Sequence, residues 1–366
     1  MMNWDVFMKD AGSKLDSRLT QRAAASRRQV LAGMTSGLAA PALFGTGLSL
    51  FSPVPEAHAA EGELRFTHVY GETVLEKPAT RVVSLGFTTQ DALLALGTPP
   101  VGIRKWFGDM PYAVWPWAQA YLGDAKPTVL AGEVSAEIVA SLQPDLIVGV
   151  GSGISKAEYD VLSQIAPVLM QAPDQAAYGT RWDVLTAMLG RALGKTAKAD
   201  ELIATNKAFF AAMRERHPDW AGKTAVCGYN FSGETGAFIG YDTRATFVTE
   251  LGFRPTEKLV GLKTAEGFYA PLSPEDLSAL DADVLIWISS FDTVPDIVSL
   301  PMRKTLKAHR EGREVMAGSL IAGALSFGSV LSLPFAAQAV ENDLALALDG
   351  DPVTVVPSSA KAGLAP

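Results

Sequence analysis

The chain has 366 residues, 48% of them hydrophobic, and a formal net charge of −8. This length suits about two domains. The acidic balance excludes proteins that bind nucleic acid or anionic membranes through a basic surface. The single cysteine, Cys227, excludes an internal disulfide and any metal site that needs two or more thiolates. No HExxH or similar metal-ligand spacing occurs.

The first 59 residues have the pattern of an export signal. Arg27 and Arg28 precede an apolar segment that runs to Phe51, and Ala57-His58-Ala59 is a small-x-small cleavage site. A transmembrane anchor is the alternative, but glycines and prolines interrupt the apolar segment. We therefore expect residues 1–59 to be a twin-arginine signal peptide, cleaved after Ala59, and the mature protein to be periplasmic. The residue directly after the cleavage site is Ala60 and not a cysteine that could carry a lipid. Cleavage removes six Lys/Arg and four Asp/Glu and leaves a formal net charge of −10.

Residues 64–180 alternate between short apolar strands and helices, and we expect them to form an N-terminal α/β lobe. The pattern predicts strands at 81–86, within 100–106 and from 145 into a Gly-Ser loop, and helices at 88–97 and 133–142. The strands are apolar along their whole length, which is typical of a parallel sheet covered on both faces.

A helical linker is predicted over 181–218. Within it, no glycine interrupts residues 195–216, and one stripe of residues recurs at spacings of three and four and is expected to be buried: Ala199, Leu202, Ile203, Asn206, Phe209, Phe210 and Met213. This pattern predicts one continuous helix that joins two lobes and holds the cleft between them largely pre-formed.

The second half repeats a piece of the first. Residues 135–148 read SAEIVASLQPDLIV and residues 273–286 read SPEDLSALDADVLI, which aligns Glu137 with Glu275 and Asp145 with Asp283. One internal repeat at this distance predicts two similar halves that share a helix–turn–strand unit.

Residues 222–349 are therefore expected to form a C-terminal α/β lobe. Strands are predicted at 224–230 and 283–289, helices at 245–252 and 273–280, and a closing helical stretch at 326–348. Residues 350–366 are expected to be a flexible tail. The predicted fold is α/β, with two lobes built on parallel sheets and joined by one long α-helix.

Loops beyond the carboxyl ends of parallel strands are where such sheets bind ligands. In these loops the sequence places many aromatic residues together with Arg and Lys, which favours a rigid, partly aromatic, anionic ligand. The candidate ligand-binding residues are Thr88, Arg104, Lys105, Trp106, Ser152, Tyr229, Phe231, Tyr241, Phe291 and Phe327. No G-x-S-x-G, P-loop or dinucleotide fingerprint occurs, so catalysis is not expected.

The segments RVVSLGFTTQDALLALGTPPVGI, EVSAEIVASLQPDLIVG and YDVLSQIAPVL, with the long linking helix, resemble periplasmic substrate-binding proteins of iron–siderophore ABC importers. The resemblance runs from about residue 64 to 348 and implies two Rossmann-like lobes bridged by one helix. It also implies a monomer that binds a ferric siderophore between the lobes and delivers it to an inner-membrane permease. The siderophore holds the iron, so no cofactor and no protein-held metal are expected.

The resemblance also assigns roles to single residues. Arg104 takes the place of the arginine that contacts the siderophore's metal-binding oxygens. Glu137 and Glu250 take the places of the carboxylates that dock on the permease, with Glu133 as a second choice in the first lobe. Two alternatives remain: a haem or corrinoid cargo, with Tyr229 or Tyr241 as the axial ligand of the haem, and an exported oxidoreductase.

Overall fold

Five short apolar segments in the first half of the chain become the strands of one parallel sheet, in the order β5-β4-β3-β6-β7. The computed structural model describes residues 63–263 and 267–366. The first-lobe strands are β1 (Leu64–His68), β2 (Gly71–Leu75), β3 (Val82–Ser84), β4 (Gly102–Arg104), β5 (Thr128–Leu130), β6 (Leu146–Val148) and β7 (Val168–Leu169). The order places β3 at the centre of this sheet, so the chain turns to opposite sides after β3 and β6, while β1 and β2 pair with each other in a separate two-stranded sheet. This is the switch-point arrangement of Rossmann-like sheets.

Helices cover both faces of this sheet, as the apolar strands predicted. Val82 packs in one apolar cluster with residues of α2 and α6, whereas its neighbour Val83 packs in another with residues of α4 and α5. Adjacent residues of a strand point to opposite faces, so both faces are buried. The helices of this part are α2 (Thr89–Ala95), η1 (Pro111–Ala113), α3 (Pro116–Gln119), η2 (Ala120–Leu122), α4 (Ala136–Ser141), α5 (Lys156–Leu162) and α6 (Trp182–Ala192).

The second lobe repeats the strand order but not all the strand directions. Its sheet has the order β10-β9-β8-β11-β12, with β8, β11 and β12 parallel and β9 and β10 antiparallel to their neighbours. Ser232 and Gly233 both have positive φ angles (49° and 84°) and reverse the chain directly after β8. The prediction of a parallel sheet is therefore right for the first lobe and wrong for β9 and β10. The strands are β8 (Ala225–Phe231), β9 (Glu234–Phe238), β10 (Tyr269–Pro271), β11 (Val284–Ile288) and β12 (Glu314–Ala317).

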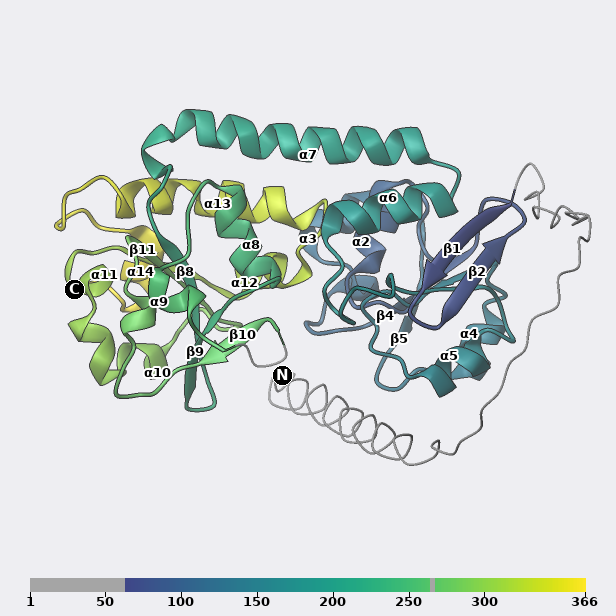
Figure 1. Cartoon of the computed structure of the whole chain (residues 1–366), viewed down its shortest axis with the longest axis horizontal. Helices are drawn as coiled ribbons and strands as arrows, with labels where there is room; N and C mark the ends of the chain where they lie inside the picture. Colours follow the sequence, from purple (N-terminus) through teal and green to yellow (C-terminus); the bar gives the residue numbers. More distant parts are fainter. Residues whose placement is uncertain (1–62, 264–266) are drawn as a thin grey trace, which may run out of the picture. The chain divides into compact units, whose positions relative to one another are not determined.

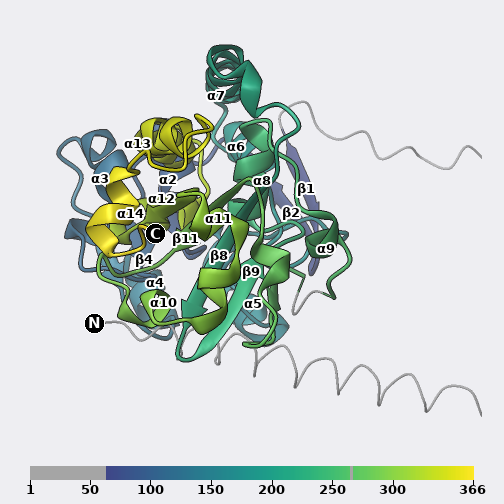
Figure 2. The same ribbon diagram turned by 90° about the vertical axis from the view of Figure 1, so that its left-hand side faces the viewer.

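Helices also lie on both sides of the second sheet. Figure 2 shows α9 on one side of β8 and α14 on the other, and α14 contacts β12. The helices of this part are η3 (Pro218–Trp220), α8 (Thr243–Glu250), α9 (Glu257–Val260), η4 (Ser278–Leu280), α10 (Pro295–Val298), η5 (Pro301–Thr305), α11 (Lys307–Arg310), α12 (Ser319–Phe327), α13 (Ser332–Ala347) and α14 (Pro357–Ala362).

The repeated aspartates perform the same structural task in both lobes. Asp145 accepts hydrogen bonds from the backbone N–H and hydroxyl of Thr80, at 2.8 Å each, just before β3. Asp283 accepts the equivalent pair from Thr224, at 2.8 and 2.9 Å, just before β8. Each aspartate thus fixes the start of the central strand of its own lobe.

The long linking helix is confirmed. α7 (Thr196–Arg216) is a single helix of 21 residues, and its buried side chains include Ala199, Asn206, Phe210 and Met213. It passes alongside α6 at one end and α13 at the other (Figure 1). The amide of Asn206 donates to the carbonyl of Val330 at 2.6 Å, which ties the middle of α7 to the junction between α12 and α13.

Two predicted helices differ from the structure. Residues 273–280 form a turn and the short η4 instead of a helix, because the side chain of Asp276 accepts from the backbone N–H of Ser278 and competes with helical hydrogen bonding. The closing stretch 326–348 is not continuous. α12 ends at Phe327 and is capped by Gly328, which has a left-handed φ of 52°, and α13 starts at Ser332.

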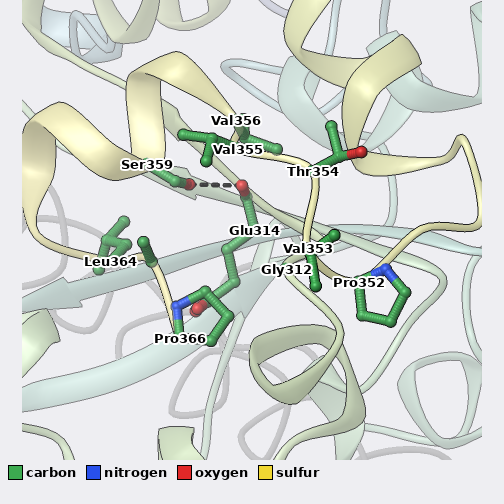
Figure 3. Close-up of a pocket in the computed structure, with 11 residues that line it drawn as sticks. Gly312, Glu314, Pro352, Val353, Thr354, Val355, Val356, Ser359, Leu364 and Pro366 are labelled. Carbon is green, nitrogen blue, oxygen red and sulfur yellow. Dashed lines mark hydrogen bonds between the residues drawn. The ribbon is translucent and has the colours of Figure 1, made fainter.

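The expected flexible tail is also wrong for residues 357–364. Pro357 starts α14, and the hydroxyl of Ser359 donates to the carbonyl of Glu314 on β12 (Figure 3). Leu364 is fully buried and its carbonyl accepts from Arg303 at 3.1 Å. A cavity of about 210 Å³ lies between this segment and Glu314. Apolar residues at the end of the chain fold onto the sheet, which composition alone did not indicate.

The predicted signal peptide, residues 1–59, lies outside the described residues. No helix in the described ranges is long and apolar enough to span a bilayer. Residues 64–366 form one compact unit, and the predicted lobe boundaries at 180 and 222 stay a prediction.

Candidate functional site

Three loops of the first lobe converge around Arg104, the last residue of β4. Its Nη1 atom donates to the carbonyl of Ser152 at 2.9 Å, in the loop after β6. Its guanidinium carbon lies 4.5 Å from the ring centroid of Phe87, in the loop after β3. Arg104 is half-buried, and stacking on an aromatic face orients a guanidinium without neutralising its charge. The predicted Arg104, Ser152 and Thr88 therefore lie at the switch point of the first sheet.

The next loop adds a row of aromatic rings. Trp106 stacks on Phe87 with ring centroids 5.6 Å apart and an interplanar angle of 29°. Trp115 and Trp117 stack at 5.1 Å and 15°. The backbone that carries these rings has positive φ angles at Tyr112 and Ala113 (55° and 58°). Non-glycine residues rarely adopt this conformation, and strain of this kind concentrates at functional sites.

Phe327, at the end of α12 in the second lobe, completes this row. Its ring centroid lies 5.6 Å from Trp106, 5.9 Å from Trp115 and 5.4 Å from Trp117. We call this group the interlobe aromatic cluster. Its members are Phe87, Trp106, Phe107, Trp115, Trp117, Phe327 and Phe335.

Only part of the cluster is accessible to a ligand. Trp106 and Phe87 are half-buried, whereas Phe327 is only 3% exposed. Ser152 is buried too, and its hydroxyl donates to the carbonyl of Gly149 at 2.6 Å. Phe327 and Ser152 were both predicted to contact the ligand. In this structure the buried Phe327 ring packs against Trp106 and forms the floor of the site, and Ser152 contacts Arg104 through its backbone carbonyl.

Lys105 is half-buried and paired within its own loop. Its Nζ lies 2.6 Å from the carboxylate of Asp109, which is exposed. The hydrogen bond and charge of Lys105 lower the pKa of Asp109 below its ordinary value. The charge of Lys105 is thus partly compensated by Asp109, and the guanidinium of Arg104 lies over the Phe87 ring.

The second-lobe candidates form a separate aromatic group. Measured between ring centroids, Tyr229 lies 6.2 Å from Tyr269, and Tyr269 lies 5.2 Å from Phe268. The Phe268 centroid lies 6.4 Å from that of Tyr241. Tyr241 is 38% exposed. Phe231 ends β8, beside the turn to β9. Phe291, in the loop after β11, is 50% exposed. Tyr241 and Phe291 are therefore the most exposed of these rings, whereas Phe231, Phe268 and Tyr269 are half-buried.

Tyr229 itself is buried. Its hydroxyl donates to Glu234 at 2.8 Å. Burial, together with this hydrogen bond and the charge of Glu234, raises the pKa of Tyr229 well above the ordinary value. A phenol held this way is a poor source of the phenolate that would ligate haem iron.

The two carboxylates expected to dock on a permease have different surroundings. Glu137 is exposed in the first turn of α4, where it accepts from the hydroxyl of Ser135 at 3.0 Å. Glu250 ends α8, and only 20% of its side chain is exposed. It lies 3.5 Å from the indole nitrogen of Trp182 and 3.7 Å from the guanidinium of Arg181. Glu250 therefore contacts the other lobe of its own chain.

The sequence prediction placed Phe87 in a loop at the cleft without choosing it as a ligand-binding candidate, and it missed Asp91. The Phe87 ring contacts both the Arg104 guanidinium and the Trp106 ring. Its position directly after an apolar strand was the sequence feature that pointed to the site. Asp91 lies on α2, in which every residue is buried. Its carboxylate accepts from Trp117 at 2.7 Å and from Ser329 at 2.6 Å. An Asp among the apolar residues of TTQDALLALG was the signal that could have identified it.

No group of three or more His, Cys, Asp and Glu side chains within residues 63–263 and 267–366 is placed to hold a metal ion. The site thus combines an oriented guanidinium, accessible aromatic rings and a buried aromatic floor.

The periplasmic binding protein family model matches residues 82–318. The chain belongs to this family. It is 32% identical over 216 residues to a probable siderophore-binding lipoprotein, YfiY, of Bacillus subtilis. The aligned region covers 57% of this chain and 63% of the relative. It is 31% identical over 182 residues to the ferric enterobactin-binding periplasmic protein FepB of Escherichia coli, covering 48% and 56%. The matches thus span about 56 to 63% of these two relatives.

Solved structures match over a larger part of the chain. A periplasmic solute binding protein from Mycobacterium smegmatis is 34% identical with a TM-score of 0.70, covering 79% of this chain and 99% of that one. Streptococcus pneumoniae PiaA in complex with ferrichrome is 25% identical with a TM-score of 0.66, covering 78% and 99%. The predicted family and two-lobed α/β fold are therefore confirmed.

Proposed function

We propose that this protein binds a ferric siderophore between its lobes and delivers it to an ABC permease for iron uptake. The observation that carries the proposal is the oriented Arg104 guanidinium beside Trp106 and Phe87 at the sheet's switch point. Ferric siderophores present planar chelating groups and anionic oxygens, which suit aromatic faces and a guanidinium. The named functions of the relatives agree with this choice of ligand. Iron enters as part of the cargo, and we assign the protein no catalytic role.

Fluorescence titration of the mature protein tests the cargo. The probes are ferrichrome, ferric enterobactin and ferric citrate, which represent hydroxamate, catecholate and carboxylate siderophores. We expect at least one to quench tryptophan fluorescence saturably, because Trp106 is accessible beside Arg104. No saturable quenching by any of the three would refute the proposed cargo. A Soret band on purified protein would instead favour haem, with Tyr241 as the axial ligand because Tyr229 is buried.

Arg104 is the proposed anion contact. We expect Arg104→Gln to lose about 1.5–3 kcal/mol of binding free energy, since a hydrogen bond to a charged group is lost. Arg310→Gln, which removes an exposed charge on α11, is the matched control. Equal dissociation constants for the two variants would remove Arg104 from the site.

We also propose a permease-docking surface with one carboxylate on each lobe. Glu137 is the first-lobe residue, as expected from the sequence. For the second lobe we propose Glu275 in place of Glu250. Glu275 aligns with Glu137 in the internal repeat and is exposed before β11, as Glu137 is before β6. Glu250 is instead engaged by Trp182 and Arg181.

Charge reversal separates these candidates. Glu137→Arg with Glu275→Arg should abolish iron uptake in cells and leave siderophore affinity intact, because like charges would face the permease. Glu250→Arg should instead lower the unfolding temperature, because Arg181 would face a like charge across the lobes. Normal uptake by the double variant, or lost uptake by a stable Glu250→Arg variant, would contradict the assignment.

We further propose that the protein is a periplasmic monomer exported by the twin-arginine route and cleaved after Ala59. The paired arginines and the Ala57-His58-Ala59 site support this route. Arg27→Lys with Arg28→Lys should retain the precursor in the cytoplasm, and N-terminal sequencing of the periplasmic form should start at Ala60. Export of the double variant at the normal rate would contradict the route.

A further inference from the structure

Asp91 joins the two lobes directly beneath the interlobe aromatic cluster. Its side chain is fully buried, and the single oxygen Oδ2 accepts both the indole N–H of Trp117 at 2.7 Å and the hydroxyl of Ser329 at 2.6 Å. Trp117 belongs to the first lobe, and Ser329 lies between α12 and α13 in the second. The other oxygen, Oδ1, is buried and has no hydrogen-bond partner among the described residues.

The segment that Asp91 holds is fixed on both sides. Phe327 inserts into the aromatic cluster, 5.4 Å from the Trp117 ring. The carbonyl of Val330 accepts from Asn206 on α7. Ser329 lies between them; its hydroxyl donates to Asp91 and also accepts from the backbone N–H groups of Leu331 and Ser332. The carboxylate of Asp91 therefore connects Ser329, two residues after Phe327, to the indole of Trp117.

No described charged side chain faces Asp91 from the elements packed around it. α3 has no ionisable side chain, and Tyr121, the only one of η2, is 46% exposed. On α6, Asp183 pairs with Arg181 and Lys207, and Arg191 donates to the carbonyl of Arg65.

The second-lobe helices give the same result. α12 has no ionisable residue. On α13, Glu341 binds Arg216 and His217, and Asp343 accepts from the backbone N–H of Ser358. Among the described residues, the hydrogen bonds from Trp117 and Ser329 are therefore the interactions that stabilise the Asp91 carboxylate against burial.

We propose that Asp91 is a positioning residue that fastens the 327–330 segment to Trp117 and so sets the ring spacing at the ligand site. The consequence for ligand affinity rests on the proposed function, whereas the link between the lobes does not.

The strength of this link depends on the ionisation of Asp91. Burial raises its pKa to about 6, against the opposing effect of the hydrogen bonds from Ser329 and Trp117. Above this pH the carboxylate accepts two charge-assisted hydrogen bonds. Below it, the neutral acid accepts weaker hydrogen bonds but no buried charge remains. Because burial raises this pKa, protonation favours the arrangement that keeps Asp91 buried, and this arrangement loses stability as the pH rises from 5 to 7.

The indole N–H resonance of Trp117 in the ligand-free mature protein reports this ionisation directly. We expect its ¹H shift to titrate with a midpoint near pH 6, with the resonance assigned by its absence in Trp117→Phe. Asp91→Asn should abolish the titration. Ser329→Ala should move the midpoint to higher pH, because the Ser329 hydrogen bond lowers the pKa. Ser359→Ala, another buried serine of the second lobe, is the control and should leave the midpoint unchanged.

A pH-independent Trp117 resonance would overturn the proposal, and so would equal midpoints in Ser329→Ala and Ser359→Ala. The ligand arm uses whichever of ferrichrome, ferric enterobactin and ferric citrate binds at pH 7.5. There Ser329→Ala should lose about fivefold in affinity, as expected for one hydrogen bond, and Ser359→Ala should lose none. If none of the three binds, the proposed cargo fails while the resonance still tests the link.

Discussion

Replacing Phe327 with alanine should affect both stability and ligand binding. The ring is 3% exposed and lies within 6.0 Å, centroid to centroid, of Trp106, Phe107, Trp115 and Trp117. Truncating a buried phenylalanine costs about 3–5 kcal/mol of unfolding free energy. Each lost aromatic pair contributes about 0.5–1.5 kcal/mol of this beyond burial. The loss around Trp106 should also weaken siderophore binding about three- to tenfold.

Phe253→Ala is the matched control for this prediction. Phe253 is also 3% exposed and stacks on Trp220 at 5.3 Å, among second-lobe residues outside the cluster. Urea unfolding should give a similar loss of stability in both variants, but only Phe327→Ala should bind the ferric siderophore more weakly. Equal affinities in the two variants would refute the role of the cluster in the site.

Two further predictions concern the structure that holds the lobes. The hydrogen bonds from Thr224, supported by nearby cations, overcome burial and lower the pKa of Asp283. Its stabilising effect is therefore present above about pH 4 and lost as the pH falls through the lowered value. Asp283→Asn should cost about 1 kcal/mol at pH 7 and nothing near pH 2 in urea unfolding, whereas the exposed Asp296→Asn should cost nothing at either pH. Asn206→Ala leaves the buried carbonyl of Val330 without its donor and should lower the free energy of unfolding by about 1–3 kcal/mol. Differential scanning calorimetry would detect this loss as a lower Tm. An unchanged Tm would exclude a stabilising link between α7 and the α12–α13 junction.

The elements that could be predicted from the sequence are those fixed by local patterns. The 21-residue α7 follows from its unbroken helical spacing, and the first sheet follows from strands that are apolar throughout. The internal repeat correctly paired Asp145 with Asp283, because each binds the residue before a central strand. It failed at residues 273–280, where the Asp276 side chain replaces helical hydrogen bonds.

Other features depend on contacts that a linear pattern does not contain. The Ser232-Gly233 pair was a readable hairpin signal, but the antiparallel β10 pairs with β9 from more than thirty positions later in the chain. Arg104 and Trp106 could be placed because they follow a strand directly. The burial of Phe327 and its meeting with the first lobe required the fold.

The central claim is that a ferric siderophore binds between Arg104 and the accessible rings of the second lobe. A crystal structure of the mature protein with a bound ferric siderophore, phased near the iron absorption edge, locates the iron by its anomalous signal. We expect a single strong peak whose chelating groups contact Arg104 and Trp106 on one side and Tyr241 or Phe291 on the other. An iron peak outside this region, or one coordinated directly by protein side chains, would contradict the claim.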